Sequence, residues 1–231
     1  MTENAVVFDC QGHDLIGVVS VPSAPGKTGV VIVVGGPQYR AGSHRQFVLL
    51  ARFLANAGVP VIRFDYRGMG DASGELRTFE NVDADIRAAV DCLLAQVPGL
   101  EQVVIWGLCD AASAALFYCT SDPRVKGLVL LNPWVRTEAG LAKAYLKHYY
   151  LQRLTEREFW LKMLQGNFNF ADSMRSLLDK LRGSRAVAAP ASGVASMETL
   201  PLPERMSECL ARFSGRVLLI LSGDDLTAQE F

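Results

Sequence analysis

A cysteine near the middle of the sequence stands where a side chain could act as a nucleophile. The pentapeptide GLCDA, residues 107–111, follows an apolar, β-branched run and precedes a run of small residues. A nucleophile between two small residues at a strand-to-helix turn is the pattern of a nucleophile elbow, where the two backbones approach closely. The pattern predicts that Cys109 attacks a carbonyl. The alternative is a buried structural cysteine in an ordinary strand-to-helix turn.

Two backbone N–H groups are expected to stabilise the negative charge that forms during such an attack. One belongs to the residue after the nucleophile, Asp110, and the other to the loop GGPQYR, residues 35–40. Pro37 has no N–H, so Gly36 is the predicted second donor. A simple Gly-Pro turn is the alternative interpretation of this loop. The residues predicted to contribute to a substrate pocket are Gln38, His44 and Trp134.

A carboxylate that orients a catalytic histidine is expected after a later strand. The segment SGDDL, residues 222–226, follows the apolar run 216–221, and Asp225 is the predicted acid, with Asp224 as the second choice. Either one could instead be a solvated turn residue. The segment FDYRGMGD, residues 64–71, is predicted to support the rim of the site, because its glycines allow a sharp turn that its Asp and Arg can tie together.

These motifs lie between alternating strand and helix patterns. Strands are predicted at 6–8 and 15–21 (a hairpin), 29–34, 60–64, 102–106, 125–131 and 216–221, and helices at 44–57, 82–93 and 110–118. This alternation predicts an α/β fold with a mostly parallel, doubly wound sheet.

The alternation stops after Trp134. Residues 134–185 show helical spacing without a strand pattern, and 186–203 have the composition of a connector. We therefore predict a core made of residues 1–133 and 201–231, and a helical cap with its connector at 134–200.

Composition excludes several classes of function. The chain has 231 residues, half of them hydrophobic, and a net charge of −1, so neither nucleic acid nor an anionic membrane surface is an expected partner. The start of the chain has no basic and apolar leader, and no apolar run approaches the ~20 residues of a membrane span. We expect a cytoplasmic protein without stable membrane insertion, acting on a small acyl substrate. The oligomeric state stays open.

The five cysteines are odd in number and show no C-x-x-C spacing, which argues against a zinc site or a disulfide framework. No metal and no cofactor are expected.

The order of the four motifs resembles the α/β-hydrolase superfamily. The closer wording GGPQYRAGSHRQF, FDYRGMGD, WGLCDAASA, LVLLNPWVR and SGDDLTAQEF resembles the exosortase A system-associated hydrolases of type 1. That bacterial family accompanies exopolysaccharide and PEP-CTERM protein-sorting loci. The resemblance covers nearly the whole chain. It implies an α/β-hydrolase fold, a Cys109 nucleophile and a cytoplasmic hydrolase of ester or thioester bonds that forms an acyl-enzyme.

The histidine of such hydrolases follows an eighth strand, whereas this sequence ends at Phe231, shortly after the acid turn. Its three histidines are His13, His44 and His148. We therefore expect a chain truncated before the last strand, in which His44 holds the oxyanion loop rather than acting as base. Three functions stay open: a hydrolase, an acyltransferase that uses the same site, and a non-catalytic binding protein of the same fold.

Overall fold

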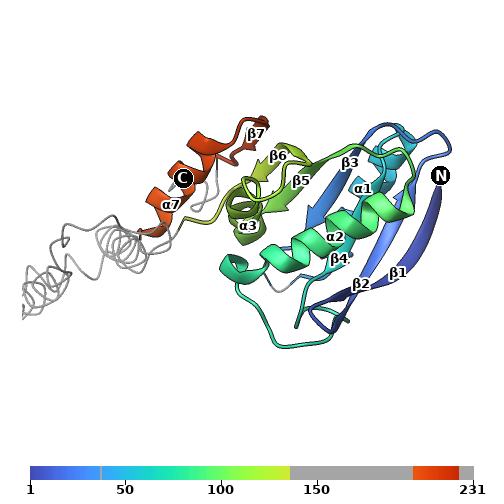
Figure 1. Cartoon of the computed structure of the whole chain (residues 1–231), viewed down its shortest axis with the longest axis horizontal. Coiled ribbons are helices and arrows are strands. Elements are labelled where there is room, and N and C mark those ends of the chain that lie inside the picture. Colours follow the sequence, from blue (N-terminus) through green and yellow to red (C-terminus); the bar gives the residue numbers. More distant parts are fainter. Residues whose placement is uncertain (37, 136–199, 224–231) are drawn as a thin grey trace, which may run out of the picture. The chain divides into compact units, whose positions relative to one another are not determined.

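The computed structural model describes residues 1–36, 38–135 and 200–223, in which seven strands form one sheet with the order β1-β2-β4-β3-β5-β6-β7 (Figure 1). β1 (Thr2–Cys10) and β2 (His13–Val21) form an antiparallel hairpin, and β2 pairs antiparallel with β4 (Val61–Asp65). The predicted hairpin is therefore present, with a longer first strand than the apolar residues alone indicated.

The other four strands run parallel to β4 and to one another. They are β3 (Thr28–Val33), β5 (Gln102–Leu108), β6 (Val125–Leu131) and β7 (Arg216–Ile220). Parallel strands place their carboxyl ends at one edge of the sheet, where open α/β sheets bind ligands. The predicted mostly parallel α/β sheet is confirmed.

Within residues 1–135, the helices α1 (Gln46–Asn56), α2 (Asp83–Gln96) and α3 (Asp110–Tyr118) connect the strands. α2 and α3 contact each other along one face of the sheet, and α1 lies against the other face (Figure 1). Short 3₁₀ turns precede two of the helices, η1 (Ser43–Arg45) before α1 and η2 (Phe79–Asn81) before α2.

The alternating side chains of β3 explain why both faces of the sheet are covered. Val30, Ile32 and Val34 pack against Phe47 and Ala51 of α1. The residues between them, which are also fully buried, point to the opposite face because side chains alternate along a strand. A continuous apolar run is therefore required here, rather than an alternating one.

Two helices differ from the prediction. α1 begins at Gln46 rather than at residue 44, because His44 and Arg45 have left-handed backbones with φ of 51° and 61°. α7 (Leu202–Arg212) was not predicted, since the prolines around its first turn have the composition of a connector. Proline fits the first turn of a helix, where its missing N–H has no partner to lose.

The chain separates into two units, Met1–Val135 with Pro201–Phe231, and Arg136–Leu200. Apart from Trp134, Val135 and Leu200, the predicted cap and connector at 134–200 lie outside the described residues. The helical cap stays a prediction.

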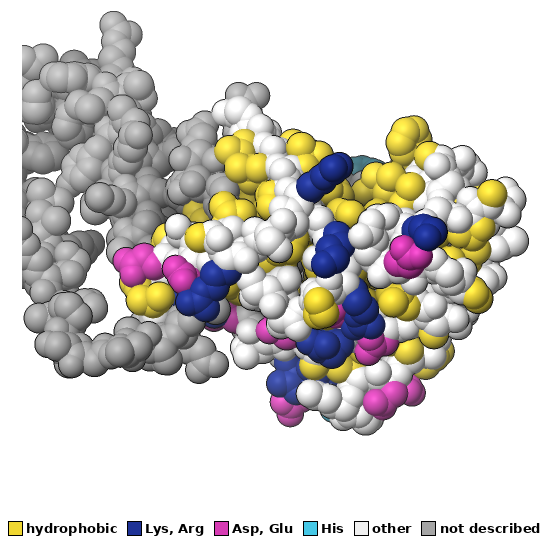
Figure 2. All heavy atoms as spheres, turned by 45° about the horizontal axis from the view of Figure 1, so that its top comes forward, with side chains coloured by type: hydrophobic (Ala, Val, Ile, Leu, Met, Phe, Trp, Pro, Cys, Tyr) yellow, Lys and Arg dark blue, Asp and Glu magenta, His cyan; other side chains and the backbone are white. Residues whose placement is uncertain are grey.

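On the face of the described residues that Figure 2 shows, charges of both signs lie close together among apolar side chains. β7 is an edge strand whose apolar side chains are 40–55% exposed: Val217, Leu218, Leu219 and Ile220. An edge strand of this kind can pair with further chain or aggregate. Within the described residues, no helix is long and apolar enough to cross a membrane.

Candidate active site

Cys109 occupies the single residue between the end of β5 and the start of α3. Its backbone has φ 59° and ψ −123°, a conformation that non-glycine residues rarely adopt. A Cβ on Gly107 would lie 2.5 Å from the Ala111 carbonyl oxygen, so strand and helix leave no room for a side chain there. The predicted elbow geometry is therefore present, with Cys109 half-buried at the carboxyl end of the central strands.

Hydrogen bonds from the neighbouring strand fix this turn. The Cys109 N–H donates to the Leu131 carbonyl at 2.9 Å, and the Trp134 N–H donates to the Cys109 carbonyl at 3.2 Å. The Ser113 hydroxyl in turn donates to the Trp134 carbonyl at 2.7 Å. The backbone of the predicted pocket residue Trp134 is thus held directly against the elbow.

The glycine loop after β3 packs against the elbow. A Cβ on Gly35 would lie 2.2 Å from the Asp110 Oδ1 atom and 2.5 Å from the Leu108 carbonyl oxygen. The next residue, Gly36, has a φ of 61° and donates its N–H to Asp110 Oδ2 at 3.0 Å. The structure brings Gly36 into contact with the Asp110 side chain, a partner of the Gly36 N–H that the sequence did not indicate. A common oxyanion position for the Gly36 and Asp110 N–H groups stays a prediction.

That partner is the side chain of Asp110, at the first residue of α3. Its Oδ1 atom accepts from the Ala111 N–H at 2.9 Å, while Oδ2 holds Gly36. Burial raises the pKa of this carboxyl, and the effect of burial exceeds the opposing effect of the N–H groups of Gly36, Ala111 and Asp110 itself. A carboxylate therefore occupies the place where the sequence predicts only backbone donors.

The other predicted pocket residues lie on the same loop and the turn after it. Gln38 is half-buried, and its Oε1 accepts from the Gln46 side chain at 3.0 Å. His44 is exposed on η1. The predicted acids Asp224 and Asp225 and the histidine His148 lie outside the described residues.

Comparison with known proteins identifies the family. The family model described as "Alpha/beta hydrolase family" matches residues 30–231. The chain belongs to the alpha/beta hydrolase family. Among the described residues of this alpha/beta hydrolase, no group of three or more His, Cys, Asp or Glu side chains is placed to hold a metal.

Two curated proteins resemble parts of this alpha/beta hydrolase. Acyltransferase drtE of Aspergillus calidoustus is 25% identical over 136 residues, which is 57% of this chain and 44% of that protein. Protein ABHD12B of Homo sapiens is 30% identical over 105 residues, 44% of this chain and 28% of that protein. The chain thus spans less than half the length of these relatives.

Solved structures share the fold of this chain at low sequence identity. The alpha/beta hydrolase GrgF from Penicillium sp. sh18 superposes with a TM-score of 0.58 and 16% identity, covering 97% of this chain and 91% of that one. The Pyrococcus furiosus esterase Pf2001 superposes with a TM-score of 0.57 and 16% identity, covering 95% and 83%.

The loop after β3 is held by an ion pair that the sequence did not indicate. The Arg40 N–H donates to Asp65 Oδ1 at 2.6 Å, and the Arg40 guanidinium pairs with both Asp65 and Asp71. This ion pair joins the loop after β3 to the turn after β4. The sequence did not indicate that Arg40 pairs with Asp65, because the two residues lie 25 positions apart.

Contacts within residues 64–71 tie the turn after β4, and its role in supporting the rim of a site stays a prediction. Asp65, Arg67 and Gly70 are the residues that tie it. A Cβ on Gly70 would lie 2.2 Å from Asp65 Oδ2, and the Arg67 guanidinium makes a buried, bidentate ion pair with Asp85 of α2. Bidentate pairs of this kind fix orientation as well as distance.

Asn132 ties the end of β6 to the end of β7. Its N–H donates to the Ile220 carbonyl at 3.0 Å, and its side-chain oxygen accepts from the Ser222 N–H at 2.8 Å. Asn132 is buried with a φ of 45°, a conformation that asparagine tolerates better than most residues. It directs the chain that leads into the predicted acid turn, and its position directly after an apolar strand was the available signal.

Proposed function

We propose that this chain cleaves an ester or thioester bond by way of a Cys109 acyl-enzyme. The observation that carries the proposal is the strained Cys109 backbone between β5 and α3, beside the glycine loop. The positive end of α3 favours a thiolate there, whereas the neighbouring Asp110 carboxylate opposes it. Once formed, a thiolate is a nucleophile without further activation.

In the proposed reaction, Cys109 Sγ attacks the carbonyl carbon, and the N–H groups of Gly36 and Asp110 stabilise the oxyanion. The bond to the leaving alkoxide or thiolate breaks, and the leaving group takes up a proton. Water then attacks the thioester, which releases the acid and restores Cys109. In this scheme the protons are moved by a histidine that Asp225 orients, a residue that is not assigned to His13, His44 or His148. Gln38, His44 and Trp134 border the acyl group.

The sequence resemblance further favours a bacterial, cytoplasmic enzyme of the exosortase A-associated type, linked to exopolysaccharide export. An acyltransferase is the second candidate, favoured by the similarity to acyltransferase drtE. Both candidates share every step up to the thioester and differ only in whether water or an alcohol receives the acyl group.

Intact-protein mass spectrometry after incubation with a p-nitrophenyl ester tests the proposal. One acyl group should add to the chain, and peptide mapping should place it on Cys109. Cys109→Ala should remove the adduct, whereas Cys92→Ala, which changes another half-buried cysteine, should retain it. An adduct that survives in Cys109→Ala contradicts the proposal.

A second measurement separates the two candidates. With excess glycerol, an acyltransferase yields the glycerol ester, whereas a hydrolase yields mainly the free acid. Product analysis by chromatography distinguishes these outcomes.

A further inference from the structure

One of the two donors predicted for an oxyanion, the Gly36 N–H, already binds an anion within the protein, as does the Ala111 N–H. The Gly36 N–H lies 3.0 Å from Asp110 Oδ2 and the Ala111 N–H lies 2.9 Å from Asp110 Oδ1. The Asp110 N–H also stabilises the charged carboxylate. These distances fall within the range of about 2.7–3.1 Å that an oxyanion requires of its donors.

The surrounding backbone keeps this carboxylate in place. Gly35 approaches Asp110 Oδ1 so closely that any side chain on residue 35 would displace it. The contact joins residues 74 positions apart, so it depends on the packing of the β3 loop on the elbow rather than on local sequence.

We infer that Asp110 is a positioning residue whose carboxylate occupies the Gly36 N–H, and that this carboxylate must leave the donor, or lose its charge, before an oxyanion can use it. The catalytic consequence rests on the proposed function, in which Cys109 attacks a carbonyl. The structural part of the inference, that the Asp110 carboxylate binds the Gly36 N–H, does not depend on that function.

The negative charge of the Asp110 carboxylate is the reason why it competes with an oxyanion for the Gly36 N–H. Two anions cannot share the Gly36 N–H, since each raises the energy of the other in a partly buried place. Burial raises the pKa of the Asp110 carboxyl, which makes its neutral form more accessible than that of an exposed aspartate. The same charge should also disfavour anionic reagents at Cys109.

Amide hydrogen exchange tests the structural part on the full chain. Removing the acceptor in Asp110→Ala should speed exchange of the Gly36 amide at least about tenfold, as expected for the loss of a hydrogen bond worth about 1.4 kcal/mol. Asp14→Ala, which removes an exposed carboxylate on β2, should leave that rate unchanged. An unchanged Gly36 rate in Asp110→Ala overturns the assignment.

Alkylation of Cys109 tests whether the negative charge of Asp110 acts on reagents at that cysteine. Iodoacetate and iodoacetamide are similar in size, and only the first is an anion, so the ratio of their rates reports charge rather than access. Asp110→Asn should raise the iodoacetate-to-iodoacetamide ratio at Cys109 at least about fivefold. The ratio at Cys92 is the internal control.

An unchanged ratio at Cys109 overturns the inference even if acylation of Cys109 is confirmed. Loss of acylation with the expected change in ratio instead contradicts only the proposed function. The two experiments therefore fail independently.

Discussion

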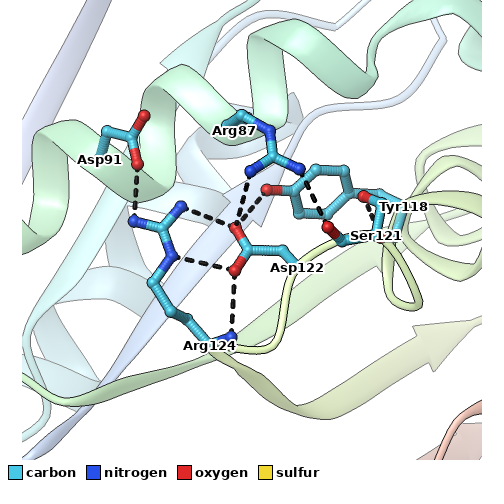
Figure 3. A network of polar contacts seen from close by, with 6 residues as sticks. All are labelled: Arg87, Asp91, Tyr118, Ser121, Asp122 and Arg124. Carbon is cyan, nitrogen blue, oxygen red and sulfur yellow. Dashed lines mark hydrogen bonds and ion pairs between the residues drawn. The ribbon is translucent and has the colours of Figure 1, made fainter.

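Two aspartates at opposite ends of α3 have opposite surroundings. At the N-terminal end, the Asp110 carboxylate is held by backbone N–H groups of the elbow and the glycine loop. Beyond the C-terminal end, the Asp122 carboxylate accepts from the Arg124 guanidinium at 2.7 and 2.9 Å and from the Tyr118 hydroxyl at 2.6 Å (Figure 3). One carboxylate therefore has dipoles for partners and the other has a cation.

The pKa values of the two carboxyl groups differ because their partners differ. Hydrogen bonds from Arg124 hold the pKa of Asp122 well below its usual range, whereas burial raises that of Asp110. Both carboxylates lose hydration on folding. The hydrogen bonds to Asp122 outweigh the effect of that loss on its pKa, whereas those to Asp110 do not. We infer that Asp122 stabilises the fold, while the charge of Asp110 costs stability at the place where the proposed chemistry occurs.

The Asp122 network also joins separate elements. Arg124 binds Asp91 of α2 at 2.6 Å, and Arg87 of α2 donates to the Ser121 carbonyl at 3.0 Å (Figure 3). Helices α2 and α3 are thereby tied to the turn that enters β6. The elbow at the other end of α3 has no need of such a tie, because β5 and β6 hold it through their backbones.

The largest effect should come from removing the paired carboxylate. Asp122→Ala leaves a partly buried arginine without its main partner and should lower the free energy of unfolding by about 3–5 kcal/mol. Asp110→Ala should lower it by no more than about 1 kcal/mol, in the range of a lost helix cap. Urea denaturation followed by circular dichroism measures both, and equal losses would remove the distinction between the two ends.

The pH dependence of stability should have opposite signs at the two sites. Because the pKa of Asp122 is lowered in the folded state, its contribution is present above the unfolded value of about 3.9 and is lost as the pH falls below it. Because the pKa of Asp110 is raised, its contribution is present below about 3.9 and is lost as the pH rises through the folded value.

Unfolding free energies of wild type, Asp122→Asn and Asp110→Asn across acidic to neutral pH measure these signs. The advantage of wild type over Asp122→Asn should shrink with acidification, and its advantage over Asp110→Asn should shrink with rising pH. Two differences that change in the same direction would contradict the assignment of partners.

The smallest effect should come from the hydroxyl in the Asp122 network. Tyr118→Phe removes one donor to the carboxylate and keeps the buried ring, so it should cost about 1 kcal/mol of unfolding free energy. Tyr39→Phe is the matched control, because the Tyr39 side chain is half exposed, and it should leave the unfolding free energy almost unchanged. A Tyr118→Phe loss as large as that of Asp122→Ala would mean that the hydroxyl, and not Arg124, carries the network.

Much of the fold could be predicted from the sequence because its signals are local. The apolar runs of β3 and β5 and the small residues around Cys109 identified the central strands and the elbow. The prediction failed where a signal was ambiguous, as for the prolines before α7 and the start of α1.

The candidate site could be predicted only in its backbone. The sequence identified Gly36 and Asp110 as neighbours of Cys109, since the order of motifs along a parallel sheet places their loops at one edge. It gave no indication that the Asp110 side chain turns toward Gly36, or that Asn132 and Arg40 fix the surrounding loops.

The sequence by itself determined the alternation of strands and helices and the turn at Cys109, because periodicity and residue size act over a few positions. Tertiary structure decided the environment of each charge. Asp110 and Asp122 look alike in the sequence, each a short acidic side chain near an end of the same helix. Their pKa values diverge because a loop 74 positions away meets one of them, whereas an arginine two positions away meets the other.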